Sequence, residues 1–247
     1  MTSKYLVNPF QSHDEIYLLS PKARNHGTVI QLQPNFLTRM AISIVDHELP
    51  YDTHNLYDVT FYNDQIHTLV THSAPMVESW LSEIMPIINE NPIVGLDVEW
   101  RPNFNSNSDH PIATLQLCVD HRCLIFQLIH AQNIPQSLFD FLANGSYKFV
   151  GAGIQNDTEK LLLDYDLKVT NTVNLGALAA TKLGRSELKN AGLKGLSKEV
   201  LRKELQKSRK VTMSRWDNEW LTCNQVQYAC IDAFISSEIG RQLTAMA

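Results

Sequence analysis

The chain has 247 residues, of which 44% are hydrophobic and 19% are charged, and this suits one globular domain with an extension or two small domains. Its net charge of −5 argues against nucleic-acid binding through overall positive charge. The cysteines (Cys118, Cys123, Cys223 and Cys230) show no C-x-x-C spacing, which favours reduced thiols and argues against a zinc site.

Two features of the apolar residues bear on where the protein resides. No stretch reaches the roughly 18 consecutive apolar residues of a membrane span. Residues 1–30 are polar and broken, without the apolar centre of a signal peptide. We therefore expect a cytoplasmic or nuclear protein, or one found in both compartments, with no membrane partner.

The predicted organisation is an extension followed by one domain. Residues 1–40 mix polar residues and proline without a period, so we expect an irregular N-terminal extension. Residues 41–247 are expected to form a single domain with its core at 92–243. No internal repeat or low-complexity tract interrupts this domain.

Strand and helix patterns alternate along the domain. Strands are expected at 58–62, 65–71, 94–100, 113–119, 122–126, 147–151 and 172–175, with hairpins at Asn63-Asp64 and Asp120-His121. Helices are expected at 74–89, 136–143, 157–165, 177–183, 192–205 and 224–243, the fifth being basic and amphipathic. Because the hairpins come first and the helices alternate with strands, we predict an α/β fold with a mixed sheet flanked by helices.

The strand expected at 94–100 carries two carboxylates on one face. Val94, Leu96 and Val98 alternate with Asp97 and Glu99, so the two acids project together from the opposite side. Neighbouring carboxylates repel each other, and a divalent cation such as Mg²⁺ or Mn²⁺ would compensate them. A polar strand face in contact with solvent is the simpler explanation of an isolated Asp-x-Glu.

Three further residues could complete such a site. Asp157 is expected in the first turn of a helix, where a carboxylate commonly stabilises the helix end. Tyr228 and Asp232 are four residues apart on the last, largely apolar helix and therefore share a face. A buried Asp232 would need a cation or a donor, and a hydrogen bond from Tyr228 is the structural alternative.

Together these motifs resemble those of the DEDD exonuclease superfamily, whose members have a ribonuclease H-like fold. The motifs are Asp97-x-Glu99, Asp157 and Tyr228-x-x-x-Asp232. The Tyr four residues before the last Asp is typical of the Tyr branch, whereas the His branch would have His in place of Gln227. The match also includes Trp100-Arg101-Pro102, Leu161, Trp216 and Leu221. The resemblance spans 92–243 and implies that 41–247 is a 3′-5′ exonuclease domain.

The resemblance also implies a two-metal mechanism of phosphodiester hydrolysis with Mg²⁺ or Mn²⁺. Asp97 would bridge both ions, Glu99 and Asp232 would hold the ion that carries the attacking water, and Asp157 would support the second ion. Tyr228 would orient the water, because an ordinary Tyr pKa of about 10 makes it a poor base at neutral pH. The expected products are nucleoside 5′-monophosphates released from a free 3′ end.

Candidate nucleic-acid contacts come from charge and aromatic residues. About half of the 21 Lys and Arg residues lie in 182–215, which is either a solvated face or a phosphate-contacting surface. Lys203, Lys207, Arg209 and Lys210 are the candidates for contacts to the backbone of the substrate. Arg101 could meet a phosphate or be an exposed structural residue. Trp100, Trp216 and Trp220 could stack on bases, although core packing is the commoner fate of Trp.

The resemblance extends to Werner-type exonuclease domains and to small plant proteins, the latter through residues 44–57. Some of these look like RISC-interacting clearing exoribonucleases, which degrade single-stranded RNA and form ring-like homo-oligomers. This implies single-stranded nucleic acid as substrate, RNA favoured over DNA, with a homo-oligomer and a small-RNA silencing or helicase partner as further expectations. The alternatives are a Werner-like DNA exonuclease and a catalytically silent nucleic-acid-binding or scaffold module.

Overall fold

The computed structural model describes residues 42–102, 109–206 and 208–246, so the extension expected at 1–40 lies outside the described residues. Its strands are β1 (Ile42–Asp46), β2 (His54–Phe61), β3 (Asp64–Thr71), β4 (Ile93–Trp100), β5 (Ile112–Val119), β6 (Arg122–Phe126), β7 (Lys148–Gly151) and β8 (Thr172–Asn174). Its main helices are α1 (Ala74–Glu90), α2 (Gln136–Ala143), α3 (Ile154–Tyr165), α4 (Leu175–Leu183), α5 (Leu193–Leu196), α6 (Arg209–Thr212) and α7 (Cys223–Ala245). Shorter turns are η1 (Leu128–His130), η2 (Ser186–Asn190) and η3 (Ser197–Leu201). Within the described ranges, no helix is both long and apolar enough to cross a membrane.

The strands form one mixed sheet with the order β1-β2-β3-β6-β5-β4-β7-β8. Strand β5 pairs antiparallel with both β6 and β4, whereas β4, β7 and β8 run parallel to one another. The five strands β6-β5-β4-β7-β8 therefore have the ribonuclease H-like arrangement, and the predicted mixed α/β fold is confirmed. Strands β1 to β3 extend this sheet beyond β6.

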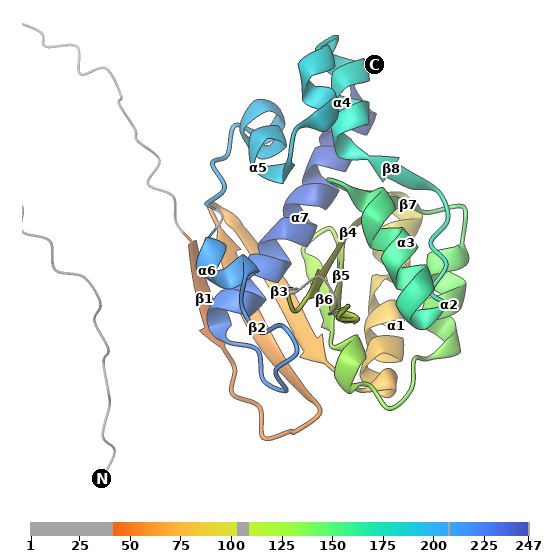
Figure 1. Ribbon diagram of the computed structural model, residues 1–247, viewed down its shortest axis with the longest axis vertical. Coiled ribbons are helices and arrows are strands. Elements are labelled where there is room, and N and C mark those ends of the chain that lie inside the picture. Colours follow the sequence, from red (N-terminus) through yellow and green to blue (C-terminus); the bar gives the residue numbers. More distant parts are fainter. Residues whose placement is uncertain (1–41, 103–108, 207, 247) are drawn as a thin grey trace, which may run out of the picture. The chain divides into compact units, whose positions relative to one another are not determined.

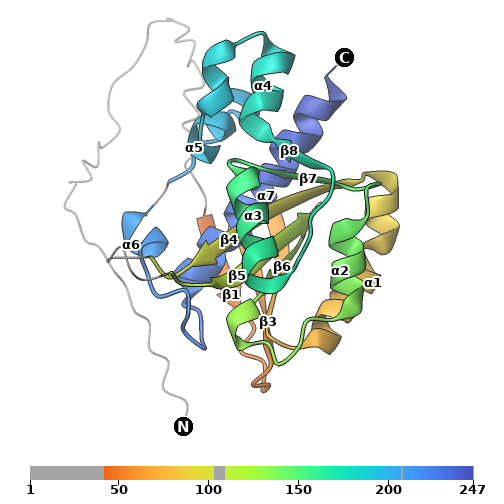
Figure 2. The same cartoon turned by 45° about the vertical axis from the view of Figure 1, so that its right-hand side comes forward.

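Helices cover both faces of the sheet (Figures 1 and 2). Helix α7 crosses one face and contributes Val226, Ile231 and Ile235 to the core on that side. Helices α1, α2 and α3 pack on the other face, in the core that contains Leu96 and Val98. Alternate residues of β4 therefore face different cores, as the two-residue period of a strand requires.

Helix α7 begins at a capping box that involves Thr222 and Gln225. The Thr222 hydroxyl accepts a hydrogen bond from the Gln225 backbone N–H at 3.3 Å, and the Gln225 side chain accepts one from the Thr222 backbone N–H at 3.0 Å. The apolar residues of α7 are buried on most sides because α4 and α5 contact it in addition to the sheet. The cap thereby fixes the starting point from which Tyr228 and Asp232 are placed.

Most of the other elements lie within a few residues of their predicted positions, but the helix expected at 192–205 ends early, at Leu201 instead of Leu205. Helix α5 ends at Leu196, the π-helical turn η3 follows, and Arg202 ends it with a left-handed φ of 58°. Residues 202–206 have no regular secondary structure. Leu193, Leu196 and Val200 are buried, so the apolar residues do follow a helical spacing. This spacing does not reveal the left-handed residue that ends the helix.

Candidate active site

Asp97 and Glu99 lie on the face of β4 over which α7 passes. Asp97 is opposite Gln116 and Glu99 is opposite Thr114 on β5, and a bulge follows Glu99. The helix comes close because Gly95 has no side chain: a Cβ atom there would lie 2.0 Å from the carbonyl oxygen of Ala233. This contact between backbones brings α7 directly beside the two carboxylates.

Tyr228 and Asp232 on α7 complete a cavity with these acids. All four side chains line a cavity of about 190 Å³, together with residues such as Ala152 and Ser236. Asp232 is only 2% exposed. Burial raises the pKa of Tyr228 above its ordinary value, and the negative charges of Asp232, Glu99 and Asp97 raise it further, as does a hydrogen bond to Asp232. The cavity therefore holds concentrated negative charge.

Asp157 lies in the first turn of α3, after Gly153 with its left-handed φ of 86°. Gly153 occupies the N-cap, so Asp157 does not cap the helix as the sequence alone would allow. Burial raises the pKa of the Asp157 carboxyl to about 7. Asp157 does not line the cavity of the other three acids, but Ala152, just before this turn, does.

The donor set fits a divalent cation. Carboxylate oxygens are the ligands that Mg²⁺ and Mn²⁺ prefer. A cation would offset the charge that raises the pKa of Tyr228 and would favour the ionised form of Asp157. Among the described residues, no three His, Cys, Asp or Glu side chains form a group that could hold a metal ion as they stand.

Asp157 gives this site a measurable effect on stability. Its pKa is raised from 3.8 to about 7, so between these pH values the native protein holds a proton that the unfolded chain has lost. The free energy of unfolding of the metal-free protein should therefore fall as the pH rises from about 4 to about 7, by at most on the order of 4 kcal/mol. In EDTA at pH 8, we expect Asp157→Asn to unfold at a higher temperature than the wild type.

The exposed residue Glu159 on the same helix provides the control. Glu159→Gln should follow the wild-type pH profile of thermal unfolding. Added Mn²⁺ should stabilise the wild type more than Asp157→Asn, because the variant lacks one negative charge. If Asp157→Asn is less stable than the wild type in EDTA at pH 8, the Asp157 carboxylate stabilises the fold and does not serve to bind a cation.

The aromatic candidates and Arg101 lie in different surroundings. Trp216 is fully buried and Trp220 is 57% exposed, so only Trp220 presents a large free surface. Trp100 is partly buried against the core on the α1 side of the sheet. The Arg101 guanidinium forms an ion pair with Asp217 at 3.1 Å, although 38% of the side chain is exposed.

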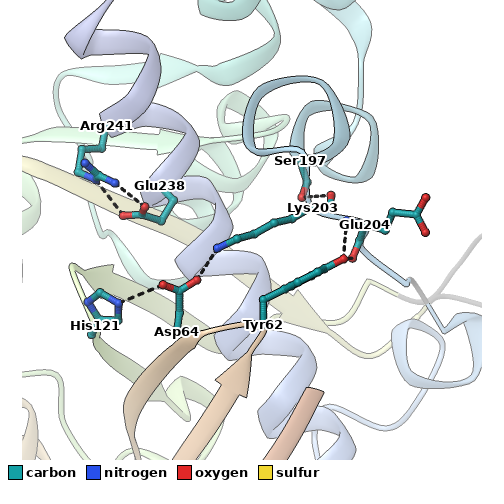
Figure 3. A network of polar contacts seen from close by, with 8 residues as sticks. All are labelled: Tyr62, Asp64, His121, Ser197, Lys203, Glu204, Glu238 and Arg241. Carbon is teal, nitrogen blue, oxygen red and sulfur yellow. Dashed lines mark hydrogen bonds and ion pairs between the residues drawn. The ribbon is translucent and has the colours of Figure 1, made fainter. Parts of the chain in front are cut away.

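The basic candidates also differ from one another. Arg209 and Lys210 are exposed on α6. Lys203 instead forms an ion pair with Asp64 at the turn between β2 and β3 (Figure 3). Lys207 lies outside the described residues.

A second, larger cavity adjoins the acidic one, and the sequence did not indicate it. It measures about 510 Å³ and shares Tyr228 and Asp232 with the smaller cavity. Leu205, Gln206 and Val211 form part of its wall. These residues carry no recognisable motif, and of the three only Leu205 falls within the helix expected at 192–205, whereas Val211 lies on α6.

Comparisons with known proteins point to one family. The family model of 3′-5′ exonucleases matches residues 77–247. The bifunctional 3′-5′ exonuclease/ATP-dependent helicase WRN of Mus musculus is 36% identical over 67% of this chain and 12% of WRN. A 3′-5′ exonuclease of Arabidopsis thaliana is 37% identical over 61% of this chain and 52% of that protein, so the chain spans about half or less of these relatives. The EXD2 exonuclease domain, in a crystal structure from a soak in Mn, covers 72% of this chain and 90% of its own with 28% identity and a TM-score of 0.44.

Proposed function

The chain belongs to the 3′-5′ exonuclease family, and on that premise we propose that it removes nucleoside 5′-monophosphates from the free 3′ end of single-stranded nucleic acid. The observation that supports this most directly is the cavity that Asp97, Glu99, Tyr228 and Asp232 line together. Residues 41–247 are the proposed exonuclease domain, and residues 1–40 are the proposed extension.

The proposed metal ligands are the four carboxylates of Asp97, Glu99, Asp157 and Asp232. Their oxygens suit two Mg²⁺ or Mn²⁺ ions. When bound, such ions stabilise the negative charge that develops on the attacking and leaving oxygens during phosphodiester hydrolysis. The protein holds Asp97 and Glu99 on a central strand and Asp232 on a buried helix, so these ligands lose little conformational freedom when they bind.

Tyr228 is the proposed positioning group for the attacking water. Burial and three acidic neighbours raise its pKa in the metal-free protein, and even the ordinary Tyr value of about 10 leaves the hydroxyl protonated at neutral pH. A protonated hydroxyl can hold a water molecule by a hydrogen bond but does not take up its proton. Tyr228 therefore orients the water, and it does not act as a general base.

Tyr228→Phe should accordingly retain measurable activity. Loss of orientation without loss of the carboxylates should reduce kcat by about ten- to a hundredfold. Initial rates on an end-labelled single-stranded oligonucleotide measure this effect. A loss as complete as that of a carboxylate variant would instead assign a proton-transfer role to Tyr228.

RNA is the proposed preferred substrate, and the resemblance to plant relatives through residues 44–57 supports it. The same resemblance supports a homo-oligomer and a small-RNA silencing or helicase partner. The values of kcat/KM for matched single-stranded RNA and DNA test the preference, because only contacts to the 2′-hydroxyl distinguish the two substrates. Faster hydrolysis of DNA would favour the Werner-like alternative. Binding of both substrates without any hydrolysis would favour the silent scaffold.

A further inference from the structure

The wall of the larger cavity depends on a segment that has no regular secondary structure. Residues 202–206 follow the left-handed Arg202, and Leu205 and Gln206 of this segment line the 510 Å³ cavity that Tyr228 and Asp232 also line. Without helical or sheet hydrogen bonds, the position of such a segment is set by its other contacts. Any substrate that occupies this cavity meets the segment.

Contacts from the turn between β2 and β3 hold this segment in place (Figure 3). The Tyr62 hydroxyl accepts a hydrogen bond from the Glu204 backbone N–H at 2.9 Å and lies 3.4 Å from the Glu204 carbonyl oxygen, to which it donates. The Ser197 hydroxyl donates to the Lys203 carbonyl oxygen at 2.8 Å. Backbone groups of two consecutive residues are therefore fixed by side chains from elsewhere in the chain.

The Lys203 side chain adds a charged contact to the same turn. Its ammonium group forms an ion pair with Asp64, and it lies 5.6 Å from the ring centre of Phe61 and 5.9 Å from that of Tyr62. The Lys203 and Asp64 side chains are only 26% and 25% exposed, so solvent screens this pair less than a surface pair. His121, 3.5 Å from the same Asp64, is a second basic neighbour of the carboxylate.

We propose that Tyr62, Asp64 and Lys203 form a clasp that positions residues 202–206 as a wall of the substrate cavity. The inference rests on the exonuclease function proposed above and refines it. Lys203 is then a positioning residue that acts through its own backbone, and it is not a phosphate contact. A phosphate of the substrate could bind the Lys203 ammonium group only by displacing Asp64.

The clasp and the phosphate contact predict different kinetics. In the clasp, Lys203→Met and Asp64→Asn disrupt the same ion pair. Each variant should raise KM roughly three- to thirtyfold with a smaller change in kcat. The double variant should have nearly the same KM and kcat as the single variants, because both substitutions disrupt one interaction. The salt dependence of KM should keep its slope. If Lys203 instead contacts a phosphate, Lys203→Met should lower the slope of log KM against log salt by about one unit. Asp64→Asn should then leave KM unchanged or lower it.

Hydrogen–deuterium exchange of residues 202–206 provides a readout that needs no turnover. Lys203→Met, Asp64→Asn and the milder Tyr62→Phe should each accelerate exchange in this segment, while melting temperatures confirm that each variant is folded. Lys168→Met removes an exposed positive charge elsewhere and should leave KM and exchange unchanged. If the wild type shows no hydrolysis, the proposed function fails, and exchange alone still decides whether the clasp exists.

Two results would overturn the clasp. One is a flattened salt dependence in Lys203→Met combined with an unchanged or lower KM in Asp64→Asn. The other is wild-type exchange of residues 202–206 in all three single variants. Equal, non-additive increases in KM at a constant salt slope, together with faster exchange, support it.

Discussion

Asp97→Ala is expected to lower kcat by about a thousandfold or more, because charge stabilisation by bound metal ions is worth several kcal/mol. Asp97 shares its cavity with Glu99, Tyr228 and Asp232, and the proposal places it on both ions. Truncation removes no apolar packing and relieves repulsion from Glu99, so thermal unfolding in EDTA should show that the variant is still folded. Initial rates and thermal unfolding of the same preparation measure both effects.

Glu159→Ala provides the matched control for this prediction. Glu159 is also acidic but is exposed on α3, so its removal should leave both the rate and the melting temperature unchanged. The addition of Mg²⁺ should raise the melting temperature of the wild type and of Glu159→Ala more than that of Asp97→Ala. Wild-type turnover by Asp97→Ala would refute the assignment of the four carboxylates.

Gly95→Ala should damage both the fold and the site. The new Cβ atom would lie 2.0 Å from the Ala233 carbonyl oxygen and 2.8 Å from the Ser237 backbone nitrogen, and neither backbone atom can move without shifting α7. Overpacking of this kind costs about 1–3 kcal/mol or more. Because Asp232 is next to Ala233, the shift should also displace it from Asp97 and reduce kcat, which urea unfolding and initial rates would show.

Gly145→Ala separates a local clash from a general effect of replacing glycine. A Cβ atom at residue 145 meets nothing within 4 Å. This variant should therefore fold with wild-type or slightly higher stability, because alanine lowers the entropy of the unfolded chain. Equal stability and equal activity of Gly95→Ala and the wild type would mean that close packing of α7 on β4 does not define the site.

Local periods account for the parts of the site that could be predicted from the sequence. The two-residue period of a strand places Asp97 and Glu99 on one face, and the spacing of four on a helix does the same for Tyr228 and Asp232. Neither period brings β4 and α7 together. The expectation that the two elements meet rests on the family resemblance. In the structure they can approach each other because Gly95 has no side chain.

Long-range contacts account for the parts that could not be predicted. Tyr62 and Glu204 are 142 positions apart, and no local pattern links them. The left-handed φ of Arg202 ends a spacing of apolar residues that otherwise favours a helix. The charge density around Lys203 likewise does not distinguish an ion pair with Asp64 from a phosphate contact.

The central claim is tested most directly by digestion of a 5′-end-labelled single-stranded RNA with Mg²⁺ or with EDTA, using the wild type and Asp97→Ala. We expect a ladder of products that shortens from the 3′ end only for the wild type with Mg²⁺, together with release of nucleoside 5′-monophosphates. A matched DNA oligonucleotide in the same experiment measures the preference for the sugar. An equal ladder in EDTA or with Asp97→Ala would contradict the proposed metal-dependent carboxylate site.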